Sequence, residues 1–242
     1  MEQTTLAVLA VILSAVLSLE AYKLHCLTRL GSVASFAVGS LVGVFGSINA
    51  FFLMTVFTVC GFLVTIKDFD RKKAAGLQEG ELGERDWTNV LGVALPPCMA
   101  AVANYLWPMQ PEVFYVLFIS TITVAGADTI ASEIGVRDSR TYMITTMKPC
   151  EPGVNGGVSP TGTAVSTVAA LLIAILGWFA MTGTVSAYAL VPFAMGVLGN
   201  VLDSVFGALL ENRGYISKYT NNCSTAIIAS VMGAVIMHCI LF

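Results

Sequence analysis

The feature that most constrains this chain is a series of apolar stretches along its whole length, each about as long as a membrane-spanning helix. A helix needs roughly 17 to 25 mostly apolar residues to cross a bilayer. Breaking the sequence at charges, prolines and glycines predicts eight spans, at residues 4–22, 30–46, 49–66, 88–106, 112–131, 162–182, 185–209 and 222–241. Only residues 46–49 separate the second span from the third, which leaves a seven-span alternative. We expect an all-α, polytopic membrane bundle.

The composition excludes a soluble globular protein. Hydrophobic residues make up 56 % of the 242 residues and charged residues only 11 %, against about 25 % charged residues in ordinary soluble domains. Lipid must therefore cover much of the surface. The formal net charge of −3 also argues against nucleic-acid binding, which needs a basic face to neutralise phosphates.

The basic residues indicate the orientation of the spans. All 12 Lys and Arg residues fall in the first, third, fifth and seventh connections, which lie on one side of an eight-span chain. The positive-inside rule makes this side cytoplasmic and places both termini on the other side. We treat residues 1–242 as one membrane domain, with a charged cytoplasmic loop at 67–87 and a longer glycine-rich cytoplasmic loop at 132–161.

Two aspartates near the cytoplasmic ends of their predicted spans are the first candidates for function. Asp128 and Asp203 lie at matching depth, each after a glycine and before a hydroxyl residue. Charges in hydrocarbon are costly and are rarely present without a role, although these two could simply end their helices in the headgroup region. A weak internal duplication would let both acids converge on one metal, and oxygen-only ligands favour Mg²⁺.

The glycine-rich run 153–163 leads directly into the sixth predicted span. Glycine N–H groups can surround an anion, and the helix start offers a positive end to phosphate. The pattern predicts a phosphate-binding loop, with an ordinary turn as the alternative, and it lacks the Gly-Lys-Ser/Thr ending of a P-loop. Lys67, in the charged loop, could add charge to the same site or contact lipid headgroups.

Several motifs in this order resemble those of the phytyl-phosphate kinase family. These integral membrane isoprenyl-phosphate kinases are known from chloroplast tocopherol synthesis and are distantly related to CTP-dependent polyprenol and dolichol kinases. The matching motifs are Asp128-Thr129-x-Ala131-Ser132-Glu133-x-Gly135, Ile144-Thr145-Thr146-x-Lys148, Pro152-Gly153-x-Asn155-Gly156-Gly157-Val158-Ser159-x-x-Gly162-Thr163 and Leu202-Asp203-Ser204-x-x-Gly207-Ala208. The chain departs from the family pattern at Val154 and at Cys150-Glu151.

The resemblance implies transfer of a phosphoryl group from a nucleoside triphosphate, with CTP favoured, to an isoprenyl monophosphate such as phytyl or geranylgeranyl phosphate. Under this hypothesis Asp128, Glu133 and Asp203 bind Mg²⁺, while Lys148 and Arg140 stabilise the transferred group. The residues assigned to nucleotide or phosphate binding are Lys67, Ser132, Thr145, Thr146, Lys148, Asn155, Gly156, Gly157, Ser159, Gly162, Thr163, Ser204 and Asn222.

Two other functions fit parts of the same pattern. A cytidylyltransferase that forms a CDP-lipid would also use acids, Mg²⁺ and a lipid phosphate. A cation-coupled transporter is the other alternative, but transporters normally hold such acids near the bilayer midplane, between broken helices. The expected partners are the bilayer, an isoprenyl monophosphate and a nucleoside triphosphate, with the active site on the cytoplasmic face.

Overall fold

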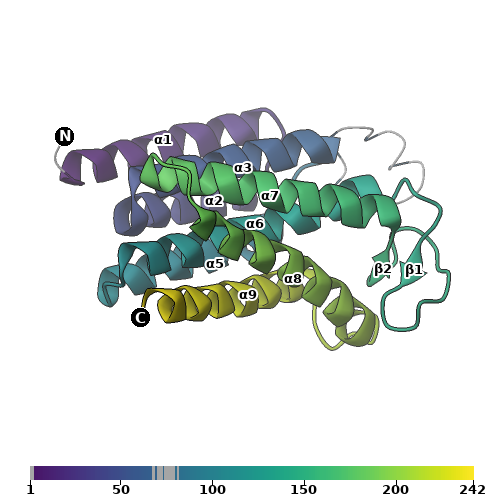
Figure 1. Cartoon of the computed structure of the whole chain (residues 1–242). Helices are drawn as coiled ribbons and strands as arrows, with labels where there is room; N and C mark the ends of the chain where they lie inside the picture. Colours follow the sequence, from purple (N-terminus) through teal and green to yellow (C-terminus); the bar gives the residue numbers. More distant parts are fainter. Residues whose placement is uncertain (1–2, 67–68, 70–72, 74–79, 81) are drawn as a thin grey trace. The chain divides into compact units, whose positions relative to one another are not determined.

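The computed structural model describes residues 3–66, 69, 73, 80 and 82–242. Lys67 and most of the predicted charged loop at 67–87 therefore lie outside the described residues. The chain forms two compact units, Met1–Pro108 and Met109–Phe242. Figure 1 labels their helices and strands.

Eight helical segments in the described part of the chain are long and apolar enough to cross a membrane. In the first unit they are α1 (Gln3–Lys23), α2 (Arg29–Leu41) with its π-helical continuation η1 (Val42–Gly46), α3 (Ile48–Ile66) and α5 (Trp87–Leu106). In the second unit they are α6 (Pro111–Gly135), α7 (Pro160–Thr182), α8 (Leu190–Phe206) with the flanking turns η2 (Ala187–Ala189) and η3 (Gly207–Glu211), and α9 (Lys218–Leu241). The predicted all-α bundle of eight spans is confirmed.

The seven-span alternative is wrong because the chain breaks at Ser47. Its backbone is extended, with φ −170° and ψ 168°. The Ser47 hydroxyl accepts a hydrogen bond from the Ala50 N–H at 3.1 Å, which is how a serine before a helix satisfies one of the free N–H groups at the helix start. The second and third spans are thus separate helices.

In the first unit, glycines let neighbouring helices approach closely. A Cβ atom at Gly39 would collide with the Ser14 side chain of α1, and one at Gly43 would collide with Ala10. Small residues at such positions are the usual means of close packing between membrane helices. The helix α5 continues through the buried Pro96 and Pro97 without interruption.

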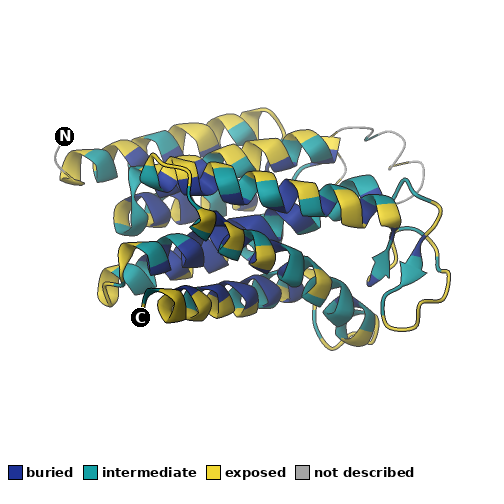
Figure 2. Cartoon of the chain, viewed as in Figure 1, coloured by how far each residue is buried: buried dark blue, intermediate teal, exposed yellow. Residues whose placement is uncertain are grey.

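In the second unit, α6 packs against α7, α8 and α9. It is the most buried of the spans: 14 of its 25 residues are buried. The outer face of α9 is exposed and apolar, as Figure 2 shows in yellow, and includes Val231 and Val235. An exposed apolar face on a long helix is typical of contact with lipid.

A small antiparallel pair of strands lies beyond the helix ends in this unit (Figure 1). β1 (Tyr142–Met143) and β2 (Gly157–Val158) pair with Tyr142 opposite Val158 and Met143 opposite Gly157. They are the only strands among the described residues. The pairing folds the predicted glycine-rich loop back on itself.

Candidate active site

The structure brings Asp128 and Asp203 together: both side chains line one cavity and interact with each other. The cause is the packing of α6 against α8. A Cβ atom at Gly199 would lie 2.6 Å from Cγ1 of Val124, so the Val124 side chain packs against the α8 backbone where Gly199 has no side chain. Each aspartate follows its contact residue by four positions, or about one helical turn. The two aspartates therefore lie one helical turn beyond the contact between Val124 and Gly199.

A cavity of about 180 Å³ lies beside the acid pair. Its walls come from the ends of α6 and α8, the starts of α7 and α9, and the glycine-rich segment between β1 and α7. The lining residues are Asp128, Ala131, Ser132, Gly135, Val136, Thr141, Gly153, Val154, Asn155, Gly156, Gly157, Val158, Ser159, Gly162, Thr163, Asn200, Asp203, Ser204, Gly207, Glu211, Lys218 and Asn222.

The start of α9 holds Asp203 in place. Oriented with its nitrogen toward Asp203, the Asn222 amide donates to Oδ1 at 3.1 Å and to the Lys218 carbonyl at 3.0 Å. The fully buried Asn221 donates from Nδ2 to the Asp203 carbonyl at 2.9 Å and to Glu211 Oε1 at 2.6 Å. These bonds fix the end of α8 against α9, as expected for buried amides.

Two charged lining residues, Glu211 and Lys218, were not among the predicted site residues. The π-helical segment η3 continues α8 to Glu211, beyond the predicted end of the seventh span at residue 209. Lys218 is the first residue of α9, directly after Ser217, which caps the helix. The signal that could have found Glu211 is an acid close to the end of an apolar span.

The glycine-rich loop docks onto η3 through Gly156. This residue has φ +80°, and a Cβ atom on it would lie 2.5 Å from Cβ and 2.8 Å from Cα of Ala208. Next to it, the Asn212 side chain donates to the Asn155 carbonyl at 2.9 Å. A residue other than glycine would meet both backbone strain and a collision here. The glycine is therefore explained by packing, which also shapes one wall of the cavity.

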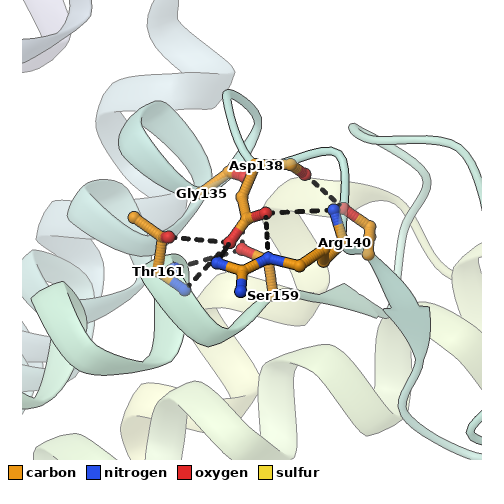
Figure 3. A network of polar contacts seen from close by, with 7 residues as sticks. Gly135, Asp138, Arg140, Ser159 and Thr161 are labelled. Carbon is orange, nitrogen blue, oxygen red and sulfur yellow. Dashed lines mark hydrogen bonds and ion pairs between the residues drawn. The ribbon is translucent and has the colours of Figure 1, made fainter.

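At the start of α7, the first N–H groups have hydrogen-bond partners within the protein. Pro160 has no N–H group, the Thr161 N–H donates to Asp138 Oδ2 at 3.3 Å, and the Gly162 N–H donates to the Ser159 hydroxyl at 3.1 Å. Figure 3 shows the hydrogen bonds of Asp138 with Thr161 and Arg140. The N–H groups of Thr161 and Gly162 are thus already hydrogen-bonded within the protein, and phosphate binding by Ser159, Gly162 and Thr163 stays a prediction. These residues line the cavity as part of its wall.

Comparison with known proteins gives the family. The sequence profile described as "Integral membrane protein DUF92" matches residues 12–238. This chain belongs to that family.

Relatives of this DUF92 chain occur in archaea and plants. It is 28 % identical to the uncharacterized membrane protein MJ0933 of Methanocaldococcus jannaschii, over 96 % of this chain and 94 % of the relative. It is 28 % identical to the protein PGR of Arabidopsis thaliana, over 87 % and 81 % of the two chains. It is 27 % identical to the chloroplastic protein VTE6 of Arabidopsis thaliana, over 87 % of this chain and 64 % of the relative. No solved structure matches it.

Some predicted site residues of this DUF92 protein do not line the cavity. They are Glu133, Arg140, Thr145, Thr146 and Lys148. Apart from Glu133, which is half-buried, their side chains are exposed. Within the described ranges no three His, Cys, Asp or Glu side chains form a metal-binding group, so Glu133 does not join the two aspartates.

Arg140 has a different partner from the predicted phosphoryl group. Its Nε donates to Asp138 Oδ1 at 3.1 Å and its Nη2 donates to Oδ2 at 3.2 Å. Arg140 is 67 % exposed, whereas the Asp138 side chain is only 8 % exposed. The Arg140 guanidinium, and after it the Thr161 hydroxyl, hold the pKa of the Asp138 carboxyl well below its usual range. Asp138 therefore links the loop to the start of α7, and Arg140 holds the Asp138 carboxylate in place.

Proposed function

We propose that this chain transfers the terminal phosphoryl group of a nucleoside triphosphate, with CTP as the favoured donor, to an isoprenyl monophosphate such as phytyl or geranylgeranyl phosphate. The observation that carries the proposal is the meeting of Asp128 and Asp203, from two different helices, in one cavity with the glycine-rich loop. The resemblance of these motifs to phytyl-phosphate kinases gives the substrate class. The similarity of this chain to the chloroplastic protein VTE6 is compatible with this substrate class.

The cavity residues fit a magnesium ion. The oxygen groups available at this place are the carboxylates of Asp128 and Asp203 and the hydroxyl of Ser204. Mg²⁺ prefers oxygen ligands and is commonly held by one or two carboxylates plus water and substrate phosphates. Asp128 and Asp203 would hold the ion, and Ser204 lies beside them. When bound, Mg²⁺ would neutralise charge on the phosphates of the two substrates.

The proposed reaction needs electrostatic stabilisation more than proton removal. The bond from the terminal phosphorus of CTP to its bridging oxygen breaks, and a bond forms from that phosphorus to a phosphate oxygen of the acceptor. The products are CDP and the isoprenyl diphosphate. A monophosphate with a second pKa of about 6 is largely a dianion at pH 7, so its oxygen is already nucleophilic. The protein groups then need to position two anions and offset their repulsion.

The position of the cavity suits a lipid acceptor. It lies at the ends of apolar helices that are long enough to span a membrane, so an isoprenoid tail can stay in lipid while its phosphate reaches the acid pair. The basic residues around this end, such as Arg137 and Arg213, favour the cytoplasmic face under the positive-inside rule. A soluble nucleotide reaches the same end from the cytoplasm.

Labelled nucleotide distinguishes this reaction from its nearest alternative. Purified protein in lipid nanodiscs is incubated with Mg²⁺, geranylgeranyl monophosphate and CTP labelled at either the γ or the α phosphate, with ATP, GTP and UTP in parallel. Kinase activity places the γ label in geranylgeranyl diphosphate and releases CDP. A cytidylyltransferase places the α label in a CDP-lipid and releases pyrophosphate. This second result, or no product with any nucleotide, would overturn the proposal.

Variants tie the reaction to the cavity. Asp128→Asn and Asp203→Asn each remove a proposed metal ligand and are expected to abolish turnover while the protein still folds. Glu133→Gln is the matched control, because Glu133 lies on α6 but outside the cavity. It is expected to keep turnover. Near-normal turnover in either aspartate variant would remove the acid pair from the reaction.

A further inference from the structure

Lys218 lines the same cavity as three acidic residues, Asp128, Asp203 and Glu211, which we call the acid cluster. It is the first residue of α9 and lines the cavity although the residue as a whole is exposed. Its backbone carbonyl accepts a hydrogen bond from the Asn222 amide that also contacts Asp203. The start of the helix is therefore tied to the site, while the flexible side chain of Lys218 can reach into it.

The charges that line the cavity are unbalanced. Asp128, Asp203 and Glu211 supply three carboxyl groups, and Lys218 is the one Lys or Arg among the lining residues that the structure describes. Its ammonium group interacts electrostatically with all three of these acids. Arg140 and Lys148, two of the three cations predicted to contact phosphate, do not line the cavity: Arg140 pairs with Asp138, and Lys148 is exposed. The third, Lys67, lies outside the described residues.

We propose that Lys218 has two successive partners: it is the counter-ion of the acid cluster before a divalent cation binds, and it becomes the phosphate-binding cation of the cavity afterwards. The inference rests on the proposed function. An ammonium ion and a divalent cation compete for the same carboxylates. Once the divalent cation neutralises the acids, the Lys218 ammonium group is drawn to the incoming phosphates. A lysine suits this exchange because it is a compact charge on a long, flexible stem.

The two roles predict opposite effects of one substitution. In Lys218→Met the competing charge is gone, so Mn²⁺ alone is expected to bind about tenfold more tightly. With Mn²⁺ saturating, CTP is expected to bind about tenfold more weakly, because a charge-assisted contact to phosphate is lost. Lys218→Arg keeps the charge and is expected to leave Mn²⁺ affinity unchanged. Lys23→Met removes an exposed lysine that does not line the cavity, and is expected to change neither affinity.

Both affinities can be measured on the whole protein in nanodiscs. Electron paramagnetic resonance of free Mn²⁺ gives the metal affinity, and equilibrium binding of labelled CTP gives the nucleotide affinity. Unchanged or weaker Mn²⁺ binding in Lys218→Met would overturn the counter-ion role, and unchanged CTP binding would overturn the phosphate role. These readouts do not need turnover. The expected shifts in a protein that forms no isoprenyl diphosphate would therefore support the role of Lys218 while refuting the proposed reaction.

Discussion

The close approach of α6 and α8 can be tested by adding one methyl group at Gly199. In Gly199→Ala the new Cβ would lie 2.6 Å from Val124 Cγ1 and 3.0 Å from Val124 Cβ, whereas carbon atoms in contact are ordinarily about 3.5–4.0 Å apart. The helices must then separate by about 1 Å. Because Asp128 and Asp203 lie one turn further along, this displacement reaches the acid pair directly.

The expected loss is larger in turnover than in stability. Overpacking costs about 1–3 kcal/mol, and replacing a helical glycine by alanine returns about 1 kcal/mol, so the net loss of stability is within about 2 kcal/mol. A displacement of about 1 Å at a reacting centre can lower the rate about 100-fold. We therefore expect Gly199→Ala to fold but to transfer γ-labelled phosphate about 100 times more slowly.

A compensating substitution makes the test specific. Val124→Ala removes both methyl groups that the new Cβ would meet, and leaves a 3.0 Å contact that a small shift relieves. The double variant Val124→Ala with Gly199→Ala is expected to recover most of the lost turnover, with Val124→Ala alone as the control. Thermal unfolding in detergent, followed in parallel, reports stability. Full activity in Gly199→Ala, or no recovery in the double variant, would refute the packing argument.

Two further predictions concern the loop between β1 and α7. Gly156→Ala should lower turnover and thermal stability much more than Gly214→Ala: both glycines have positive φ, but only Gly156 meets a neighbouring backbone. Equal effects of the two changes in unfolding and label-transfer assays would remove the docking role of Gly156. The lowered pKa of the Asp138 carboxyl means that its contribution to stability is present above the usual carboxyl pKa of about 4 and is lost as the pH falls below it. Asp138→Asn should therefore be less stable than the unchanged protein at pH 7, with a difference that narrows toward pH 3 in thermal unfolding scans; a constant difference would show that the carboxylate charge does not matter.

The sequence predicts the eight spans because hydrocarbon imposes one simple requirement, a long apolar helix without free backbone groups. It does not predict the short strands β1 and β2, since two-residue pairs have no periodic pattern. It also does not predict the full length of the seventh span, which is formed by α8 and η3. The π-helical segment η3 extends α8 to Glu211, past the point where apolar character ends.

The acid pair was predictable for a physical reason, and other parts of the site were not. An aspartate within a span is unusual, so two at equal depth stand out. By contrast, a helix start is an anion site only if its N–H groups are open. Asp138 lies 23 residues before Thr161 in the sequence, but its carboxylate accepts a hydrogen bond from the Thr161 hydroxyl at 2.7 Å. The start of α7 is therefore already occupied by a protein group. No pattern in the sequence indicates that the loop brings Asp138 back to the start of α7.

The most direct test of the central claim is the number and location of bound divalent ions. Electron paramagnetic resonance titration of the nanodisc protein with Mn²⁺ is expected to give one tightly bound ion per chain. This ion should be lost in Asp128→Asn and in Asp203→Asn, and retained in Glu133→Gln. A protein that binds no Mn²⁺, or that keeps its ion without either aspartate, would contradict the account.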